Sequence, residues 1–166
     1  NATSTAATAH LKTCTVTVKD TSAPLASGVN EAYDLSIGSD GQCSISAETV
    51  WGAFHGMESL AQLAAENCTI SNAPVNIRDT PRFGFRGLMI DTARHFIPVE
   101  FLEHIIDGMA ANRLNVLHWH IVDSISFPFQ SKTYPQMSAT GAYSPSHIYT
   151  HSDIQGVVDY ALKRGI

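Results

Sequence analysis

The second half of this chain alternates between short apolar runs and segments with helical periodicity, and this alternation restricts its fold more than any other feature. Two runs, residues 85–91 and 115–122, are apolar over most of their length; the first ends in Asp91, and Asp123 directly follows the second. Each precedes a segment whose apolar side chains recur every three or four positions, the period of an amphipathic helix. Strands of this kind that are joined by helices belong to a parallel sheet covered on both faces.

The two helices of this region have recognisable ends. Pro98 suits the first position of a helix that we expect to reach about Arg113. The second helix is predicted to begin near Ser152 and Asp153 and to end before Gly165. The expected apolar stripes are Phe101, Leu102, Ile105, Ile106, Met109 and Ala110 in the first helix, and Ile154, Val157, Val158, Ala161 and Leu162 in the second. A (β/α)8 barrel has about 250 residues, so this α/β region is predicted to be the first two βα units of an incomplete TIM barrel.

The first 80 residues carry a different pattern, short strands around one long helix. Residues 1–12 are rich in Thr, Ala and Ser and are predicted to be a frayed end or linker. The expected strands cover residues 13–19, 32–37, 42–45, 69–70 and 75–78, of which the second and third form a hairpin and the last two a strand pair. The pattern predicts a small α+β domain of residues 1–80, separated by Pro81 from a second domain of residues 81–166.

The long helix of the first domain is expected to begin at Ser46, a residue type that caps helix N-termini, with Glu48 in its first turn. Its apolar side chains recur at three- and four-residue spacing and predict the buried face. They are Val50, Phe54, Met57, Leu60, Ala61 and Ala64.

Composition excludes two classes of partner. The chain has 10 basic and 15 acidic residues and a net charge of −5, which provides no electrostatic basis for binding nucleic acid. No apolar run approaches the roughly 20 residues that span a bilayer. We therefore expect neither a nucleic-acid partner nor a membrane span.

The compartment is indicated by glycosylation sequons and cysteines. Asn1 and Asn67 each begin an Asn-x-Thr tripeptide, so both are predicted glycosylation sites. Cys14, Cys43 and Cys68 all lie in the first 70 residues. An odd number allows one disulfide and a spare thiol, a bond to another piece of chain, or three buried free cysteines. Together these features favour a lysosomal or secreted protein.

Two polar clusters lie at the C-terminal ends of the two predicted barrel strands, where parallel α/β folds carry their functional residues. The first consists of residues 91–95 and includes Arg94, whose guanidinium can clamp hydroxyls or a carboxylate. The second contains His118, His120 and Asp123, with both histidines on one face of the strand. Each residue also has a purely structural interpretation, as an ion-pair partner, a hydrogen-bonded histidine or a loop cap. The occurrence of both clusters at neighbouring strand ends favours function.

The segments RGLMIDTARHF (residues 86–96) and NVLHWHIVD (residues 115–123) resemble the opening of the catalytic barrel of the family 20 glycoside hydrolases, the β-N-acetylhexosaminidases. The resemblance continues through GAYSPSHIYTHSDIQGVVDYALKRGI and covers residues 80–166. Upstream, ISAETVWGAFHGMESLAQL resembles the helix of the small zincin-like α+β domain that precedes this barrel.

The resemblance implies removal of terminal β-linked N-acetylglucosamine or N-acetylgalactosamine from glycoconjugates or chitin-type oligosaccharides, without a cofactor or metal. It implies retention of configuration, with the 2-acetamido oxygen of the substrate as the nucleophile. Arg94 matches the arginine that holds the hydroxyls at C3 and C4 of the sugar. Asp123 matches an aspartate that positions a histidine and tunes the general acid, and His120 lies beside it in the same motif.

The chief departure from the family is the catalytic Asp-Glu pair, because no Asp-Glu dipeptide occurs in these 166 residues. We expect this chain alone to be inactive and to need the remainder of the barrel, in the same or a second polypeptide. A homo- or heterodimer is also expected from the resemblance.

Two alternatives stay open at this point. The spacing of His118 and His120 is also that of a metal-dependent TIM-barrel hydrolase, and the chain could instead be a non-catalytic carbohydrate-binding remnant.

Overall fold

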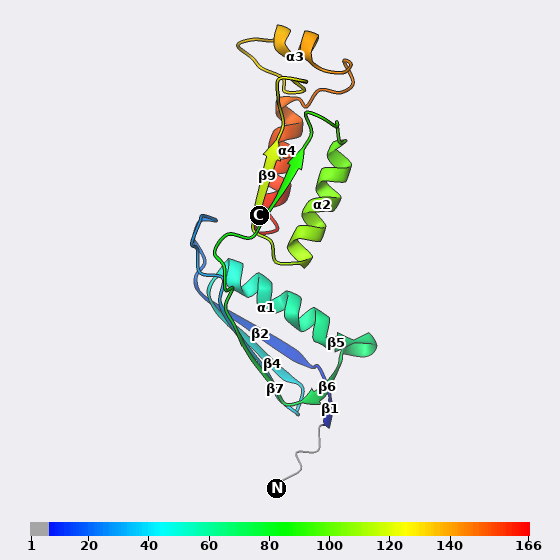
Figure 1. Ribbon diagram of the computed structural model, residues 1–166. Helices are drawn as coiled ribbons and strands as arrows, with labels where there is room; N and C mark the ends of the chain where they lie inside the picture. Colours follow the sequence, from blue (N-terminus) through cyan, green and yellow to red (C-terminus); the bar gives the residue numbers. More distant parts are fainter. Residues whose placement is uncertain (1–6) are drawn as a thin grey trace. The chain divides into compact units, whose positions relative to one another are not determined.

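The computed structural model describes residues 7–166, which form two compact units that divide after Gly84 (Figure 1). The first unit contains most of the strands and one long helix, and the second contains two parallel strands and three helices. The chain is therefore an α/β protein. Within the described residues, no helix is long and apolar enough to cross a membrane.

Four strands form the main sheet of the first unit, in the order β2–β4–β3–β7. β3 (Tyr33–Ile37) and β4 (Gln42–Thr49) pair antiparallel, so the predicted hairpin is confirmed. β2 (Thr13–Asp20) runs parallel to β4 at one edge, and β7 (Val75–Asp79) runs antiparallel to β3 at the other. The sheet is therefore mixed.

A smaller sheet has the order β1–β6–β5, formed by Ala7–His10, Thr69–Ala73 and Ala64–Ala65. The presence of β1 corrects the expectation that residues 1–12 are a frayed end, while residues 1–6 lie outside the described part. β6 and β7 belong to different sheets, so the expected strand pair is wrong. Pro74 alone separates them, whereas a hairpin turn has at least two residues.

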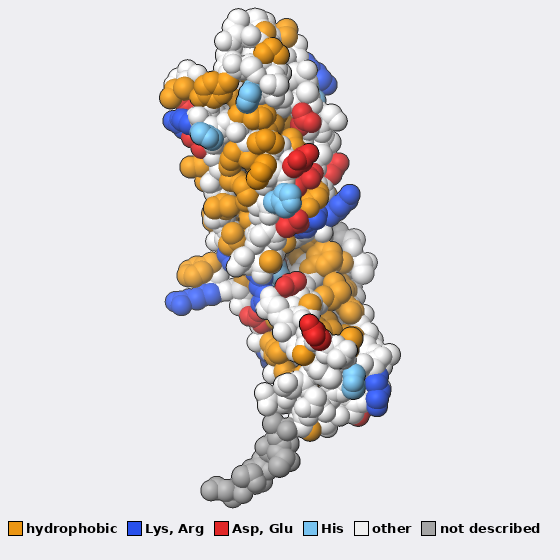
Figure 2. Space-filling view, turned by 90° about the vertical axis from the view of Figure 1, so that its right-hand side faces the viewer, with side chains coloured by type: hydrophobic (Ala, Val, Ile, Leu, Met, Phe, Trp, Pro, Cys, Tyr) orange, Lys and Arg blue, Asp and Glu red, His pale blue; other side chains and the backbone are white. Residues whose placement is uncertain are grey.

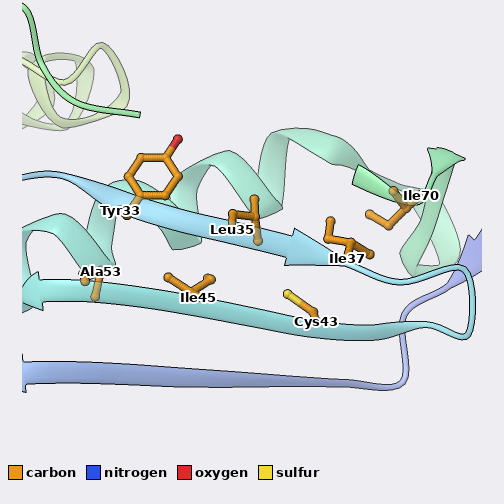
Figure 3. Packing of buried hydrophobic residues seen from close by; sticks show 8 residues of the cluster. Tyr33, Leu35, Ile37, Cys43, Ile45, Ala53 and Ile70 are labelled. Atoms are coloured by element: carbon orange, nitrogen blue, oxygen red, sulfur yellow. The ribbon is translucent and has the colours of Figure 1, made fainter. Parts of the chain in front are cut away.

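The core of the first unit consists largely of alternate side chains of two strands. Along β3 and β4 every second side chain is buried, and these side chains point toward α1 (Val50–Leu63; Figure 3). A period of two places alternate residues on one face of a sheet. The buried cluster consists of Tyr33, Leu35, Ile37, Cys43, Ile45, Ala47, Ala53 and Ile70.

The start of α1 differs from the prediction. β4 continues through Ser46, and the N-cap is Thr49, whose hydroxyl accepts a hydrogen bond from the N–H of Gly52. Ser46 therefore lies in a strand and caps nothing. Ser and Thr are both good N-caps, so residue type alone did not distinguish the two positions.

The buried face of α1 also differs from the predicted stripe. The helix buries Gly52, Ala53, Gly56 and Ser59, whereas Phe54 is 42% exposed and Met57 40% exposed. A Cβ added to Gly56 would lie 2.6 Å from Ile45 Cγ2, so only small side chains allow the helix to approach the sheet this closely. Leu60 and Ala64 of the predicted stripe do pack against the core. Glycine scores weakly in a search for apolar periodicity, so the prediction included the exposed Phe54 and Met57 and left out Gly52 and Gly56.

The second unit is built on β8 (Gly87–Asp91) and β9 (Val116–His120), which pair in parallel as predicted. α2 (Val99–Ala111) begins directly after Pro98. α4 (His151–Leu162) begins after Thr150, which forms a capping box with Asp153. α3 (Gln136–Gly141) lies in the long segment between β9 and α4.

The buried core of this unit combines side chains from β8, α2, α4 and the segment before α4: Ile90, Leu102, Ile106, Tyr149, Val157 and Ala161. Three residues of the predicted stripes are exposed instead, namely Phe101, Val158 and Leu162. Figure 2 shows hydrophobic side chains on the surface of the chain. The exposed faces of these helices are therefore partly apolar.

Candidate functional site

The predicted polar clusters meet at the carboxyl ends of the two parallel strands. Asp91, the last residue of β8, lies opposite His120, the last residue of β9. The turn after β8 is fixed from within: the N–H of Thr92 donates to the His120 carbonyl (3.0 Å), and Trp119 Nε1 donates to Thr92 Oγ1 (2.9 Å). Thr92 is fully buried. The strand ends therefore hold the following loop in place.

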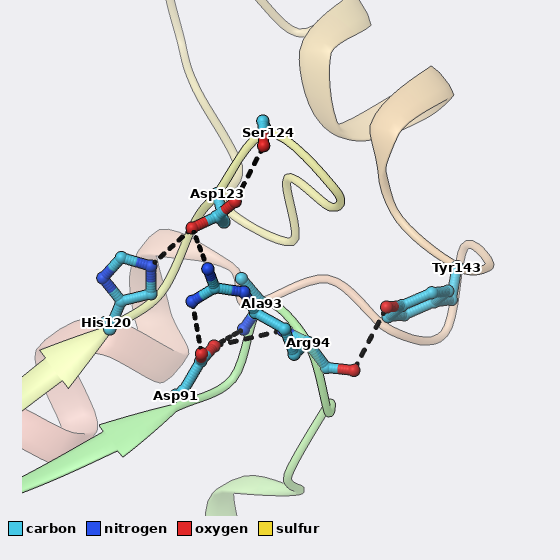
Figure 4. Close-up of polar contacts among 7 residues, drawn as sticks. All are labelled: Asp91, Ala93, Arg94, His120, Asp123, Ser124 and Tyr143. Carbon is cyan, nitrogen blue, oxygen red and sulfur yellow. Dashed lines mark hydrogen bonds and ion pairs between the residues drawn. The ribbon is translucent and has the colours of Figure 1, made fainter.

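Arg94 is held first by Asp91 (Figure 4). Asp91 Oδ1 accepts hydrogen bonds from the backbone N–H groups of Ala93 (3.0 Å) and Arg94 (3.1 Å), which closes a tight turn. Asp91 Oδ2 accepts a hydrogen bond from Arg94 Nη1 at 2.6 Å. One carboxylate thus fixes both the backbone and the side chain of the arginine.

Asp123, in the loop that follows β9, also binds Arg94. Its Oδ2 lies 2.9 Å from Arg94 Nη2 and 3.1 Å from His120 Nε2, and its Oδ1 accepts a hydrogen bond from Ser124 Oγ at 2.9 Å. The N–H of Asp123 donates to the carbonyl of Ser126, which fixes the backbone of this loop. Asp91, Arg94, Asp123 and His120 therefore form one connected cluster, the strand-end cluster.

These contacts keep the charged groups of the strand-end cluster ionised. Hydrogen bonds from Ser124 and His120, together with the charge of Arg94, lower the pKa of Asp123 to about 2. Backbone and side-chain hydrogen bonds from Arg94 lower the pKa of Asp91, and the hydrogen bond to Asp91 raises the pKa of Arg94. An ionised carboxylate only accepts hydrogen bonds, so at neutral pH Asp123 can orient His120 and Arg94 but has no proton to donate.

The guanidinium of Arg94 keeps donors available. Its side chain is 52% exposed, and its ion pairs engage one side of each terminal nitrogen. A guanidinium has five N–H donors in a rigid plane. The cluster can therefore present a fixed fork of donors to a neutral, hydroxyl-rich ligand, while the charge is already balanced by two carboxylates.

Sequence reasoning missed the side chains that complete the surroundings of Arg94. Tyr143 Oη donates to the carbonyl of Arg94 at 3.1 Å, and a pocket of about 350 Å³ is lined by Arg94, His95, Phe96, Tyr143 and His147. Tyr143 and His147 lie in the long segment between β9 and α4. The one available signal was the length of that segment, since long connections in compact domains are commonly functional.

His118 is separate from the strand-end cluster. His118 lies on β9, opposite Met89 of β8, and its side chain is exposed. Among residues 7–166, no group of three or more His, Cys, Asp and Glu side chains is arranged to hold a metal ion. The alternative of a metal-dependent hydrolase that uses His118 and His120 thus lacks a ligand set in this part of the chain.

Of the two predicted glycosylation sites, the structure describes only Asn67. Asn67 is exposed in the short 3-10 helix Glu66–Cys68, with a φ of 69°, a left-handed conformation that asparagine tolerates well. Asn1 lies outside the described residues. Glycosylation at both positions stays a prediction.

A protein-family comparison places this fold and cluster in a known class. Residues 83–166 match the catalytic domain of glycosyl hydrolase family 20, and residues 1–63 match a model described as beta-acetyl hexosaminidase like. The chain therefore belongs to glycosyl hydrolase family 20, as the two strand motifs predicted.

Individual relatives agree with this assignment. The chain is similar to beta-hexosaminidase subunit beta of Mus musculus, with 45% identity over 82% of this chain and 26% of that protein. It is similar to beta-hexosaminidase A of Caenorhabditis elegans, with 45% identity over 92% of this chain and 28% of that protein. The chain thus spans little more than a quarter of the length of these curated relatives.

Solved structures share the fold. A chitobiase of Flavobacterium johnsoniae matches 92% of this chain and 23% of its own, with a TM-score of 0.82 and 34% identity. A family 20 beta-N-acetylhexosaminidase of Streptomyces coelicolor A3(2) matches 91% of this chain and 32% of its own, with a TM-score of 0.74 and 27% identity.

Proposed function

We propose that the protein containing this chain is a β-N-acetylhexosaminidase that removes terminal β-linked N-acetylglucosamine or N-acetylgalactosamine from glycoconjugates or chitin-type oligosaccharides. The observation that carries the proposal is the guanidinium of Arg94, fixed between Asp91 and Asp123 at the strand ends of a family 20 domain. The names of the relatives, beta-hexosaminidase and chitobiase, support the same substrate class.

In the proposed site Arg94 binds the terminal sugar. Sugar hydroxyls accept hydrogen bonds from a guanidinium fork, and neighbouring hydroxyls such as those at C3 and C4 offer two acceptors side by side. The carboxylates of Asp91 and Asp123 fix the fork before the sugar arrives, so little side-chain freedom is lost on binding. Asp91 is thus a positioning residue that the sequence motif alone did not single out.

Asp123 and His120 act as positioning residues in this proposal. Asp123 is ionised and holds His120 Nε2 at 3.1 Å, so it can orient a histidine and hold its proton in place. The bond cleavage itself follows the substrate-assisted route, in which the 2-acetamido oxygen attacks the anomeric carbon and the leaving oxygen takes a proton from a general acid. That acid belongs to an Asp-Glu pair, which this chain does not contain.

The open faces of the second unit support the proposal that β8 and β9 are the first two strands of a (β/α)8 barrel. Parallel sheets are covered on both faces, yet Leu88 and Met89 of β8 are 39% and 57% exposed. We infer that the rest of the barrel, in the same or a second polypeptide, covers these side chains. We also infer that this chain alone does not hydrolyse glycosides.

Three further points belong to the same proposal. The exposed sequon at Asn67 supports passage through the secretory route to the lysosome or the outside of the cell. The relatives named as subunits alpha and beta support assembly as a homo- or heterodimer. No cofactor takes part, because the acetamido group of the substrate supplies the nucleophile.

The test compares three chromogenic substrates with the full-length protein: β-N-acetylglucosaminide, β-N-acetylgalactosaminide and β-glucoside. At least one N-acetylated substrate should be cleaved on the order of 10²-fold faster than the glucoside, because only an acetamido group can attack intramolecularly. Addition of a chelator should leave the rate unchanged. Sugar binding without turnover would instead indicate a carbohydrate-binding remnant, and loss of activity with the chelator would indicate a metal-dependent hydrolase.

A further inference from the structure

Two of the three cysteines are neighbours in the main sheet of the first unit. β2 and β4 run in parallel, and their register places Cys14 opposite Cys43. Register partners on adjacent strands project from the same face of a sheet. Cys43 is buried in the core under α1, on the same face of β4 as Ile45 (Figure 3), and Cys14 packs against that core while half-buried. The two thiols therefore face one shared space.

The spacing of the strands matches the reach of a disulfide. Adjacent strands lie about 4.8 Å apart, and the Cα atoms of a disulfide are usually about 4.4 to 6.8 Å apart. The two side chains also interact: burial and the neighbouring thiol of Cys14 raise the pKa of Cys43 to about 12. The backbone would thus need little or no movement to accept a bond.

Cys68 has a different environment. It is exposed at the end of the 3-10 helix Glu66–Cys68, next to β6 of the smaller sheet. Its carbonyl accepts a hydrogen bond from the N–H of Leu11, and no cysteine is among the register partners of the neighbouring β6. The three cysteines therefore form one facing pair, Cys14 and Cys43, and one separate thiol, Cys68.

We propose that Cys14 and Cys43 form a disulfide that ties β2 to β4 and leaves Cys68 as the free thiol. The bond would tether an edge strand that has few core contacts of its own, since Cys14 and Val18 are half-buried while Val16 is 43% exposed. It would also close the loop between residues 14 and 43, which restricts the unfolded chain.

The oxidant required is a disulfide, either a small molecule or one on an oxidoreductase. The more exposed Cys14 attacks as a thiolate, forms a mixed disulfide and releases the first thiol of the oxidant. Cys43 then displaces the second thiol, and the Cys14–Cys43 bond forms. The oxidant is reduced to two thiols, which carry the two protons lost by the cysteines. Cys43 reacts second because its buried thiol holds its proton more tightly.

The test is peptide mapping of the full-length protein, purified without reductant, alkylated under denaturing conditions and freed of N-glycans. Trypsin alone cannot separate Cys43 from Cys68, because no Lys or Arg lies between Lys19 and Arg78. Glu-C cleavage after Glu48 and Glu66 places the two cysteines on different peptides. We expect residues 13–19 to be linked to the peptide that carries Cys43, and Cys68 to be alkylated before reduction.

Three variants act as matched controls. C68S should keep the linked peptide pair, whereas C14S and C43S should lose it. Reductant should lower the Tm of the wild type and of C68S, and should leave the Tm of C14S unchanged. Free thiols at both Cys14 and Cys43, a Cys14–Cys68 bond, or a bond from Cys43 to any other cysteine would overturn the proposal.

Discussion

The two units of this chain differ in how completely they bury the apolar side chains of their sheets. In the first unit β3 and β4 alternate strictly between buried and exposed side chains, and α1 covers their buried face through small residues. In the second unit two parallel strands carry apolar side chains on both faces, and part of that surface is exposed. The first unit therefore buries one face of its main sheet within the chain, whereas the second carries the strand-end cluster on a sheet whose apolar side chains are partly exposed, which we propose that further strands cover.

This difference predicts which unit folds independently. A polypeptide of residues 1–84 should show one cooperative thermal transition, because its core cluster is contiguous and buried. A polypeptide of residues 85–166 should show no cooperative transition, because a two-stranded sheet with open faces buries too little apolar surface. Circular dichroism melts of both pieces test this. A sharp melt of residues 85–166 would show that the second unit does not depend on the rest of a barrel.

Truncation of one side chain in each unit sharpens the comparison. Leu35→Ala removes a side chain that is 1% exposed and should cost about 2–5 kcal/mol of unfolding free energy in residues 1–84 and in the full-length protein alike. Met89→Ala should cost a similar amount in the full-length protein, although Met89 is 57% exposed here, because we infer that further strands cover it. Urea titrations measure both values. A cost below about 0.5 kcal/mol for Met89→Ala, the range of surface substitutions, would contradict the inferred cover.

Two helix glycines test the close approach in the first unit. Gly56→Ala places a Cβ 2.6 Å from Ile45 Cγ2 and 3.1 Å from Tyr33 Cδ2, so it should destabilise residues 1–84 by about 1–3 kcal/mol. Gly156→Ala, in α4, meets no atom within 4 Å and should stabilise the full-length protein by up to about 1 kcal/mol through helix propensity. Thermal unfolding of both variants is the measurement. Equal effects of the two substitutions would show that α1 is not packed as described.

The smallest expected effect concerns the titration of Asp123. Because the pKa of this carboxyl is lowered to about 2, its ion pair with Arg94 should be intact at neutral pH and should be lost only as the pH falls through about 2. The Ser124→Ala substitution removes the hydrogen bond that lowers the pKa of Asp123 most, so it should raise the titration midpoint of Asp123 toward the ordinary value of an aspartate. Carboxyl-carbon NMR of the full-length protein follows both titrations. A wild-type midpoint near 4 would contradict the described contacts.

Sequence alone predicted the parts of the fold in which local patterns are strong. The hairpin of residues 32–45, both parallel strands and the start of α2 directly after Pro98 follow from alternation, apolar runs and the geometry of proline. The prediction failed where tertiary packing determines the structure. Ser46 and Thr49 are equally good N-caps by residue type, and the buried face of α1 contains Gly52 and Gly56, which an apolar pattern does not detect. Pairing of β6 with β1 joins strands that lie about 60 residues apart in the chain, and no local pattern reveals it.

The grouping of Arg94, His120 and Asp123 was predicted to a similar extent, and their roles stay a prediction. Arg94, His120 and Asp123 stand out because polar residues directly follow apolar strands. The contacts of Asp91 with Arg94, and of Tyr143 with the Arg94 carbonyl, depend on how two loops fold against each other. Loop geometry has no periodic signature in the sequence, so these two residues were not identified as partners of Arg94.

The most direct test of the central claim, that Arg94 binds the terminal sugar, is a cycle of enzyme and substrate changes. kcat/KM is measured for a β-N-acetylglucosaminide and its 4-deoxy analogue, with the full-length wild type and with Arg94→Ala, and Arg78→Ala serves as a surface control. We expect loss of the hydroxyl to cost the wild type on the order of tenfold or more and to cost Arg94→Ala almost nothing. An equal loss in both enzymes would contradict a contact between Arg94 and the sugar.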